Sequence, residues 1–498
     1  MRLYSSIVQK YLLVLILSLF IYSCGEKPQP LKREVRAVWM SRFEYAQGKT
    51  SKQAKAYIRD SFQKFAAAGM NTVIFQVRGQ GDAFYRSQYE PWSNLLTDTL
   101  GQDPGWDPLQ YALTEAHASG LDLQAWINTF PAWKSEEDPP QKSQPLHPLL
   151  AHPEWVVCDS AGNPMKPSAG YITFSPGIPA VQEHILKVVE DIVSHYDVDG
   201  IHFDYIRYPE QTRERGYSRD SLSVARFQSL EDNQELFEWN VWQHEQINNF
   251  VIKAYNRITA RKPWVAVSAA VIGRHAGAGW TGYDAVLQDA RRWMATGKID
   301  QIYTMTYHRI GHPTLPFEQS LLQWKSMKYL GRLIIPGIAT YKVGKAYDWD
   351  EIWRQIEMVR RENFPGMVFF SAGSVLKALD EISEEYYPEP SLPAAMPWKK
   401  VAKVKPHGLD VKVENGMFIF SWEADTAISR YVLYMDKDTT NPEFIVSILP
   451  GIRTTFRLSR DEDNGHVRFY LTAVNRIGME SEPVAFPESQ VLSRSGDK

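Results

Sequence analysis

The chain has 498 residues and a formal net charge of −3 at pH 7. This length is too great for one ordinary domain and suits a large barrel followed by a smaller module. The charge offers no electrostatic case for nucleic acid as the main partner. The two cysteines, Cys24 and Cys158, are too few for a disulfide framework or a zinc site. We expect no metal and no cofactor.

The N-terminus has the form of a secretory signal. An apolar run from Tyr11 to Tyr22, too short for a comfortable membrane span, is followed by Ser23-Cys24-Gly25. Ile21-Tyr22-Ser23-Cys24 resembles a bacterial lipobox, in which the cysteine is lipidated and becomes the new N-terminus. The alternative is an ordinary cleaved signal with an incidental cysteine. We expect a signal peptide over 1–23, a polar tether over 24–33 and attachment through Cys24 to a bacterial membrane, the outer membrane by preference, facing the periplasm or the exterior.

From residue 34 the chain alternates short apolar strands with amphipathic helices. The predicted strands are Val35–Met40, Thr72–Val77, Leu121–Ile127, Gly200–Phe203, Trp264–Ala270, Gln301–Thr306, Leu333–Ile338 and Met367–Phe370. The predicted helices are Ser51–Ala68, Pro108–Ser119, Pro179–Tyr196, Phe237–Ala260, Tyr283–Thr296, Pro316–Leu330 and Trp349–Asn363. This rhythm predicts a (β/α)₈ TIM barrel over 34–386, with an irregular, proline-rich stretch over 129–177. The alternative, an open doubly wound sheet, is disfavoured because no glycine-rich phosphate loop follows the first strand.

The C-terminal part changes in composition. Residues 387–406 are rich in proline and lysine and predict a linker, and 407–487 predict a small all-β sandwich. Its expected strands are Leu409–Val413, Met417–Trp422, Ser429–Met435, Phe444–Ile448, Thr454–Leu458 and Val467–Val474. Trp422 and the late strand containing Tyr470 resemble a fibronectin type III module, with core packing as their role. Residues 488–498 are expected to form a frayed tail.

Polar side chains are predicted on the inner face of several barrel strands. Strand alternation directs Arg78, Trp126, Asn128, His202, Asp204 and Tyr307 toward the barrel interior or its rim. Branched aliphatic residues dominate ordinary barrel interiors, so converging polar groups at the strand ends indicate a site. Gln76, Gln124 and Gln301, deeper in the barrel, are expected to be structural.

Carboxylates and aromatic residues surround this predicted rim. Glu44 follows the first strand, Asp82 lies in the glycine-containing loop after the second, and Tyr205 and Arg207 follow Asp204. Paired carboxylates between aromatic walls fit glycoside hydrolysis, in which one group protonates the leaving oxygen and the other attacks or activates water. His308 and His312 have no neighbouring acidic ligand in the sequence and are expected to be surface or sugar contacts.

Several segments together resemble the glycosyl hydrolase-like family ten, bacterial secreted or lipid-anchored barrels. The matching segments are Arg36-Ala-Val-Trp39, Phe75-Gln-Val-Arg78, Gly81-Asp82-Ala83-Phe84-Tyr85, Glu90-Pro-Trp92-Ser93, Ala125-Trp-Ile-Asn128, His152-Pro-Glu-Trp155, Ser175-Pro-Gly177, Asp199 to Pro209, Gln288-Asp289, Ile299-Asp-Gln-Ile-Tyr303 and Met305-Thr-Tyr307. The resemblance implies a TIM barrel, carbohydrate hydrolysis and, for some relatives, cleavage of peptidoglycan glycan strands. Some members carry two adjacent aspartates in the fourth strand. Here Tyr205 follows Asp204, so the second carboxylate must come from elsewhere.

The sequence therefore predicts a lipid-anchored glycosidase of the cell envelope acting on a polysaccharide, with peptidoglycan glycan strands as one candidate. Asp204 is the expected nucleophile or general base, with Asp82 or Glu44 as its partner. Arg78, Asn128, His202, Arg207 and Tyr307 are expected to position hydroxyls and stabilise charge, and Trp126 and Tyr205 to form walls. The alternatives are a non-catalytic glycan-binding lipoprotein and an envelope scaffold acting through the sandwich. Protein partners are not specified by the sequence.

Overall fold

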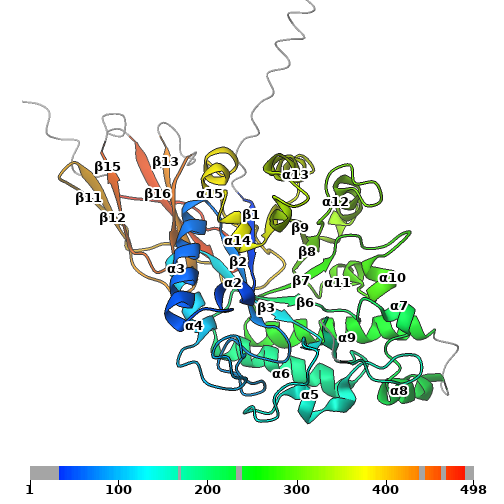
Figure 1. Cartoon of the computed structure of the whole chain (residues 1–498). Helices are drawn as coiled ribbons and strands as arrows, with labels where there is room; N and C mark the ends of the chain where they lie inside the picture. The colour runs from blue at the N-terminus through cyan, green and yellow to red at the C-terminus, as the bar shows by residue number, and fades with distance from the viewer. Residues whose placement is uncertain (1–32, 167–169, 232–237, 437–443, 461–466, 488–498) are drawn as a thin grey trace, which may run out of the picture. The chain divides into compact units, whose positions relative to one another are not determined.

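The barrel predicted from the sequence is present in the computed structural model, which describes residues 33–166, 170–231, 238–436, 444–460 and 467–487. Eight parallel strands close in the order β1-β10-β9-β8-β7-β6-β3-β2 (Figure 1). Their bounds are β1 Val35–Met40, β2 Thr72–Arg78, β3 Asp122–Asn128, β6 Gly200–Asp204, β7 Ala266–Ile272, β8 Gln301–Met305, β9 Leu333–Ile338 and β10 Gly366–Phe370. The predicted signal peptide, the predicted lipidation site Cys24 and the predicted tail lie outside the described residues.

Helices follow the barrel strands and pack on the outside of the ring (Figure 1). The main ones are α3 Ser51–Ala67, α4 Pro108–Ala118, α6 Pro179–His195, α9 Trp239–Arg261, α12 Phe317–Lys325 and α13 Trp349–Arg361. One predicted helix is instead two short ones, α10 Gly282–Val286 and α11 Ala290–Ala295. The break comes at Leu287, whose φ of 60° is incompatible with a continuing right-handed helix, and Asp289 then caps the second segment through the Arg292 N–H.

Short elements in the connections shape the rim of the barrel. They are α2 Arg42–Tyr45, β4 Pro131–Trp133, α5 Pro148–Ala151, β5 Ile172–Thr173, α7 Thr212–Arg215, α8 Ser221–Glu231, α14 Ala372–Val375 and α15 Leu379–Glu381. β4 and β5 form an antiparallel pair inside the stretch predicted to be irregular, with Pro131 opposite Thr173. Their partnership is non-local, so no turn signal in the sequence indicates it.

Among the described residues, the two main hydrophobic clusters of the barrel lie on opposite sides of the ring of strands. Outward-facing strand residues such as Val73, Phe75 and Ile201 pack against the helices. Inside the ring, Trp39, Ile74 and Tyr303 belong to a second, smaller cluster. This division follows the alternation of side chains along each strand, and it leaves the inward polar residues close to one another near the strand ends.

The C-terminal part forms two antiparallel sheets, ordered β11-β12-β15 and β14-β13-β16-β17. The strands are β11 Asp410–Glu414, β12 Met417–Ser421, β13 Ile428–Asp436, β14 Phe444–Pro450, β15 Thr455–Ser459, β16 Arg468–Asn475 and β17 Val484–Ala485. Phe420, Trp422 and Leu471 belong to their shared core. All six predicted strands are present, and β17 is an additional short strand.

The segment predicted as a linker, 387–406, is packed against the barrel. Lys399 forms a 2.9 Å ion pair with Asp300, and both side chains are buried. The Trp398 indole N–H donates to the other Asp300 oxygen at 2.7 Å. Because Asp300 directly precedes β8, these contacts attach the segment to the end of the barrel where the strands begin.

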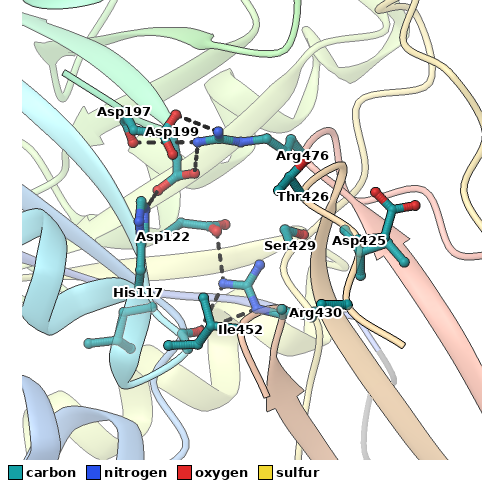
Figure 2. Close-up of a pocket in the computed structure, with 15 residues that line it drawn as sticks. His117, Asp122, Asp197, Asp199, Asp425, Thr426, Ser429, Arg430, Ile452 and Arg476 are labelled. Atoms are coloured by element: carbon teal, nitrogen blue, oxygen red, sulfur yellow. Dashed lines mark hydrogen bonds and ion pairs between the residues drawn. The ribbon is translucent and has the colours of Figure 1, made fainter. Parts of the chain in front are cut away.

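The C-terminal sheets contact that same end of the barrel through ion pairs (Figure 2). Arg430 of β13 lies 2.8 Å from Asp122, the first residue of β3. Arg476 lies 2.9 Å from Asp199, which also pairs with His117 of α4 at 2.9 Å. These groups line a cavity of about 330 Å³. Burial, opposed by Arg430, raises the pKa of Asp122.

Candidate active site

The register of β3 and β6 places two predicted site residues side by side. Asn128 and Asp204 are the last residues of their strands and are paired across the ladder. The carboxyl ends of the strands in such a barrel carry the active site in characterised enzymes of this fold. Tyr205, the next residue, has a φ of 50°. This left-handed conformation is uncommon for a bulky side chain and turns the chain sharply at the rim.

A cavity of about 550 Å³ opens above these strand ends. Six of the predicted site residues line it: Trp126, Asn128, Asp204, Tyr205, Arg207 and Tyr307. Further aromatic lining comes from Phe43, Tyr171, Trp280, Tyr341 and Phe370, and the ring of Tyr307 stacks on that of Phe370 at 6.0 Å. A cavity of this size with aromatic walls and a few convergent polar groups is typical of a small-molecule or sugar site.

Asp204 is the buried acid of the cavity, with only 7% of its surface exposed. The backbone N–H of Tyr205 donates to Asp204 Oδ1 at 2.7 Å. Arg207 Nη1 lies 3.6 Å from the same oxygen. Burial raises the pKa of Asp204, and Arg207, the Tyr205 N–H and Trp126 only partly oppose this. A carboxyl group whose pKa is raised by burial is suited to donate a proton.

A hydrogen-bonded network fixes the polar floor beside Asp204. The side-chain oxygen of Asn128 accepts from the Gln76 amide and from the Trp126 indole, each at 3.1 Å. Its amide nitrogen donates to the backbone oxygen of Gly79 at 2.9 Å. Gln76, which we expected to be purely structural, also lines the cavity. This network holds Asn128 and Trp126 in one orientation.

Arg78 lies away from the cavity lining. The β2–β3 register shifts between Gln76 and Arg78, so Arg78 pairs with the outward-facing Ile127. Its guanidinium is fully buried and donates to both oxygens of Glu90, at 2.7 and 2.8 Å. Burial alone would raise the pKa of Glu90, but Arg78 and His184 outweigh it and lower the pKa to about 2. The bulge breaks the alternation that predicted an inward Arg78.

His202 does point into the barrel, but it lies below the cavity and is fully buried. Its Nε2 accepts from the Trp39 indole at 3.1 Å, and its Nδ1 contacts the Ser268 hydroxyl at 2.9 Å. Burial lowers the pKa of His202 to about 3, so the ring is neutral at pH 7. Both contacts are to protein side chains, so a role for His202 in binding substrate stays a prediction that they do not favour.

The two predicted partner acids, Asp82 and Glu44, are both engaged by backbone groups. Asp82 Oδ1 accepts from the N–H groups of Gly79 and Gln80, and its side chain is fully buried. Glu44 accepts from Ser41 and, at 2.6 Å, from the N–H of Gly373. Neither is among the residues that line the cavity. Their catalytic assignment stays a prediction that their contacts do not favour.

A different acid, Glu210, lines the cavity together with Asp204. It is exposed and comes after Pro209, beyond the strand, where alternation gives no orientation. Lys134, Arg274 and Trp280 were also missed and come from long connections. The one sequence signal for Glu210 is its position, six residues beyond Asp204 in the connection that follows the same strand.

Residues 34–355 match the Glycosyl hydrolase-like 10 family. The chain belongs to this family. The Glycosyl hydrolase-like 10 chain is 28% identical, over 535 aligned positions, to Glycosyl hydrolase YngK of Bacillus subtilis (strain 168), covering 95% of this chain and 97% of that one. It is also 28% identical over 368 positions to Glycosyl hydrolase DigH of Escherichia coli (strain K12), covering 66% and 79%.

Among solved structures, the catalytic domain of β-amylase from Paenibacillus polymyxa resembles this Glycosyl hydrolase-like 10 chain with a TM-score of 0.52 at 9% identity, covering 72% of this chain and 99% of that one. This likeness concerns the fold alone. Family membership implies a carbohydrate substrate. Within the described ranges, no helix is long and apolar enough to cross a membrane. No group of three or more His, Cys, Asp or Glu suited to hold a metal occurs in that part of the chain either.

Proposed function

We propose that this protein hydrolyses glycosidic bonds in a polysaccharide of the bacterial cell envelope. The observation that carries the proposal is the buried carboxyl group of Asp204, which lies at the end of β6 in a cavity walled by aromatic rings. Sugar rings pack their C–H faces on aromatic side chains, and hydrolysis of the bond between two sugars requires an acid at the leaving oxygen. The names of the relatives YngK and DigH support the same reaction class.

In this mechanism Asp204 is protonated when the substrate binds and donates its proton to the leaving glycosidic oxygen. Its raised pKa favours this role over the nucleophile or base expected from the sequence. Glu210, the second acid of the lining, then acts on the anomeric carbon or activates the attacking water. Asn128 orients a sugar hydroxyl, and Tyr307 and Trp126 form the walls.

Peptidoglycan glycan strands are our preferred substrate within this class. The proposal includes the lipid anchor at Cys24, which would keep the enzyme at the membrane beside such a polymer. It also includes a fibronectin type III-like identity for the C-terminal sheets, supported by their two antiparallel layers and the core position of Trp422.

The deciding experiment measures new reducing ends released by the full chain from peptide-free peptidoglycan strands and from a panel of neutral polysaccharides. The Asp204→Asn variant should lose activity by about 10²-fold or more, because a general acid contributes roughly 10²–10⁴-fold. Glu210→Gln should lose activity similarly and keep its thermal stability, since this side chain is exposed.

The non-catalytic glycan-binding alternative gives a different result. It predicts no reducing ends from any substrate, with equal glycan affinity for wild type and Asp204→Asn. Near-normal turnover by Asp204→Asn would remove this residue from the mechanism. If Asp82→Asn or Glu44→Gln loses activity while Glu210→Gln stays active, the second catalytic acid is Asp82 or Glu44 and not Glu210.

A further inference from the structure

The cleft extends beyond the cavity that contains Asp204. A second compartment of about 460 Å³ adjoins it, and the two share Lys134, Tyr171, Tyr205, Arg207 and Glu210. The shared residues form the boundary between the compartments. A glycan long enough to pass over these shared residues would therefore contact both compartments.

The second compartment has a positive balance of charge. Its charged lining consists of Lys134, Arg207 and Glu210, and its remaining lining is neutral. Such a balance favours a ligand with an anionic substituent over one that offers neutral hydroxyls alone. Tyr171 and Tyr208 supply flat walls for a ring in the same compartment.

Within the described ranges, one donor of Arg207 makes an ion pair but no hydrogen bond. Its Nη1 is buried without a hydrogen-bond partner, and the nearest carboxylate oxygen, on Asp204, is 3.6 Å away. The guanidinium lies over the ring of Tyr205 at 4.3 Å, which limits its freedom to turn elsewhere. Buried donors are normally satisfied, and Arg207 lines both compartments, so a ligand group bound there would complete the contacts of its guanidinium.

Lys134 directly follows β4, whereas Arg207 follows β6, so the two cations come from different connections of the barrel. The Lys134 ammonium lies 5.4 Å from the ring of Tyr171 and 5.8 Å from that of Phe43. Within the described ranges no carboxylate forms an ion pair with it. Two aromatic rings hold the cation near the cleft while leaving its charge free for a ligand.

We propose that the second compartment binds a sugar carrying a carboxylate, and that Lys134 and Arg207 determine this specificity. The proposal rests on the glycosidase function proposed above and narrows its substrate to acid-bearing glycans. A carboxylate accepts hydrogen bonds from a guanidinium in a fixed planar geometry, and the lysine adds a second positive charge.

The test uses one glycan in two forms. The probe is a peptide-free fragment of peptidoglycan strand whose lactyl carboxylates are either intact or chemically reduced to alcohols. Affinity for both forms is measured with the full-length Asp204→Asn chain, which does not consume the ligand. The intact form should bind about tenfold more tightly, as expected for hydrogen bonds to a charged group.

Adding Lys134→Gln should reduce the preference for the intact form to about threefold or less. Raising the salt concentration should reduce this preference too, because salt screens the attraction between opposite charges. Lys142→Gln is the matched control, since Lys142 is exposed in the same connection and lines neither compartment. Arg207→Gln should also reduce the preference. Lys134 is exposed, so its variant keeps the test valid if Arg207→Gln fails to fold.

Equal affinity for the two forms, or an unchanged preference in Lys134→Gln, contradicts the proposal that the second compartment binds a carboxylate. If wild type then still cleaves both forms, the glycosidase function stands without it. If wild type cleaves neither form nor any neutral polysaccharide, the glycosidase function itself fails, and the narrower proposal fails with it.

Discussion

The carboxyl group of Asp204 is placed where ionisation is unfavourable. Its folded pKa lies above that of an unfolded chain because burial outweighs the nearby Arg207 and Tyr205 N–H. The contribution of such a group to stability is present below its unfolded pKa and is lost as pH rises through the folded pKa. Ionisation of Asp204 at higher pH therefore costs the folded protein stability that the unfolded chain does not lose.

Asp204→Asn should consequently make the protein more stable at pH 7, by about 0.5–2 kcal/mol. The gain should shrink as pH falls toward about 4, where the unfolded carboxyl also binds a proton. Thermal or denaturant unfolding between pH 4 and 8 measures this. The exposed Asp350→Asn serves as control, with changes within about 0.5 kcal/mol. A variant that is less stable at pH 7 and gains on acidification contradicts the raised pKa.

Residue-level prediction from sequence worked where strand alternation was regular. Asn128 and Asp204 were expected together at the rim, and the register pairs them. Arg78 was placed by the same rule, but one bulge redirected it to Glu90. His202 was placed on the correct face, yet alternation along a strand does not give depth, and its partners lie below the cavity.

The short helix α2 links two connections of the barrel through one side chain. Glu44 accepts the N–H and hydroxyl of Ser41, at 2.8 and 3.0 Å, within its own connection. It also accepts the Gly373 N–H of α14, which follows β10. The carboxylate thus joins the connections after β1 and β10, which are neighbours in the closed barrel.

Glu44→Gln should therefore lower stability more than catalysis. Losing charge-assisted hydrogen bonds should reduce the free energy of unfolding by about 1–2 kcal/mol, while kcat on the preferred glycan stays close to that of wild type. Denaturant unfolding and initial rates below the unfolding transition measure the two effects. A collapse of kcat with unchanged stability would instead restore Glu44 as the catalytic partner expected from the sequence.

Element-level prediction was accurate for the periodic segments and poor between them. β1 and β9 have their predicted bounds because short, mostly apolar runs are typical of buried parallel strands. The β4–β5 pair and the position of Glu210 depend on how distant segments fold over the rim. No local periodicity encodes that arrangement, and it supplies much of the cleft: Lys134, Tyr171 and Glu210.

At the scale of the whole molecule, the described barrel has two ends with separate tasks. Parallel strands all begin at one end and finish at the other, so Asp122 and Asp204 lie at opposite ends. The C-terminal sheets attach where the strands begin, through Arg430 and Arg476. The cleft lies where the strands finish. Attachment of the sheets therefore leaves the cleft open.

Because the sheets and the cleft are at opposite ends, removing the Arg430 contact should affect stability and not activity. Arg430 is 4% exposed and donates to the backbone oxygen of Gly120 at 3.0 Å as well as pairing with Asp122. Arg430→Met keeps the apolar stem but leaves these acceptors unpaired, which should lower the free energy of unfolding by about 1–3 kcal/mol at pH 7. Arg457→Met, on an exposed position of β15, is the matched control and should change little.

The loss of stability in Arg430→Met should depend on pH. Burial already raises the pKa of Asp122, and Arg430 is the main group that opposes the rise. Without Arg430 the folded pKa moves higher still, so the ionised carboxylate destabilises the variant most at neutral pH and the deficit shrinks as pH falls toward the unfolded value of about 3.9. Unfolding measured from pH 4 to 8 checks this trend, and kcat/KM below the transition should match wild type because the cleft is at the other end. A deficit that is independent of pH, or a loss of activity in the folded variant, contradicts this assignment of the two ends.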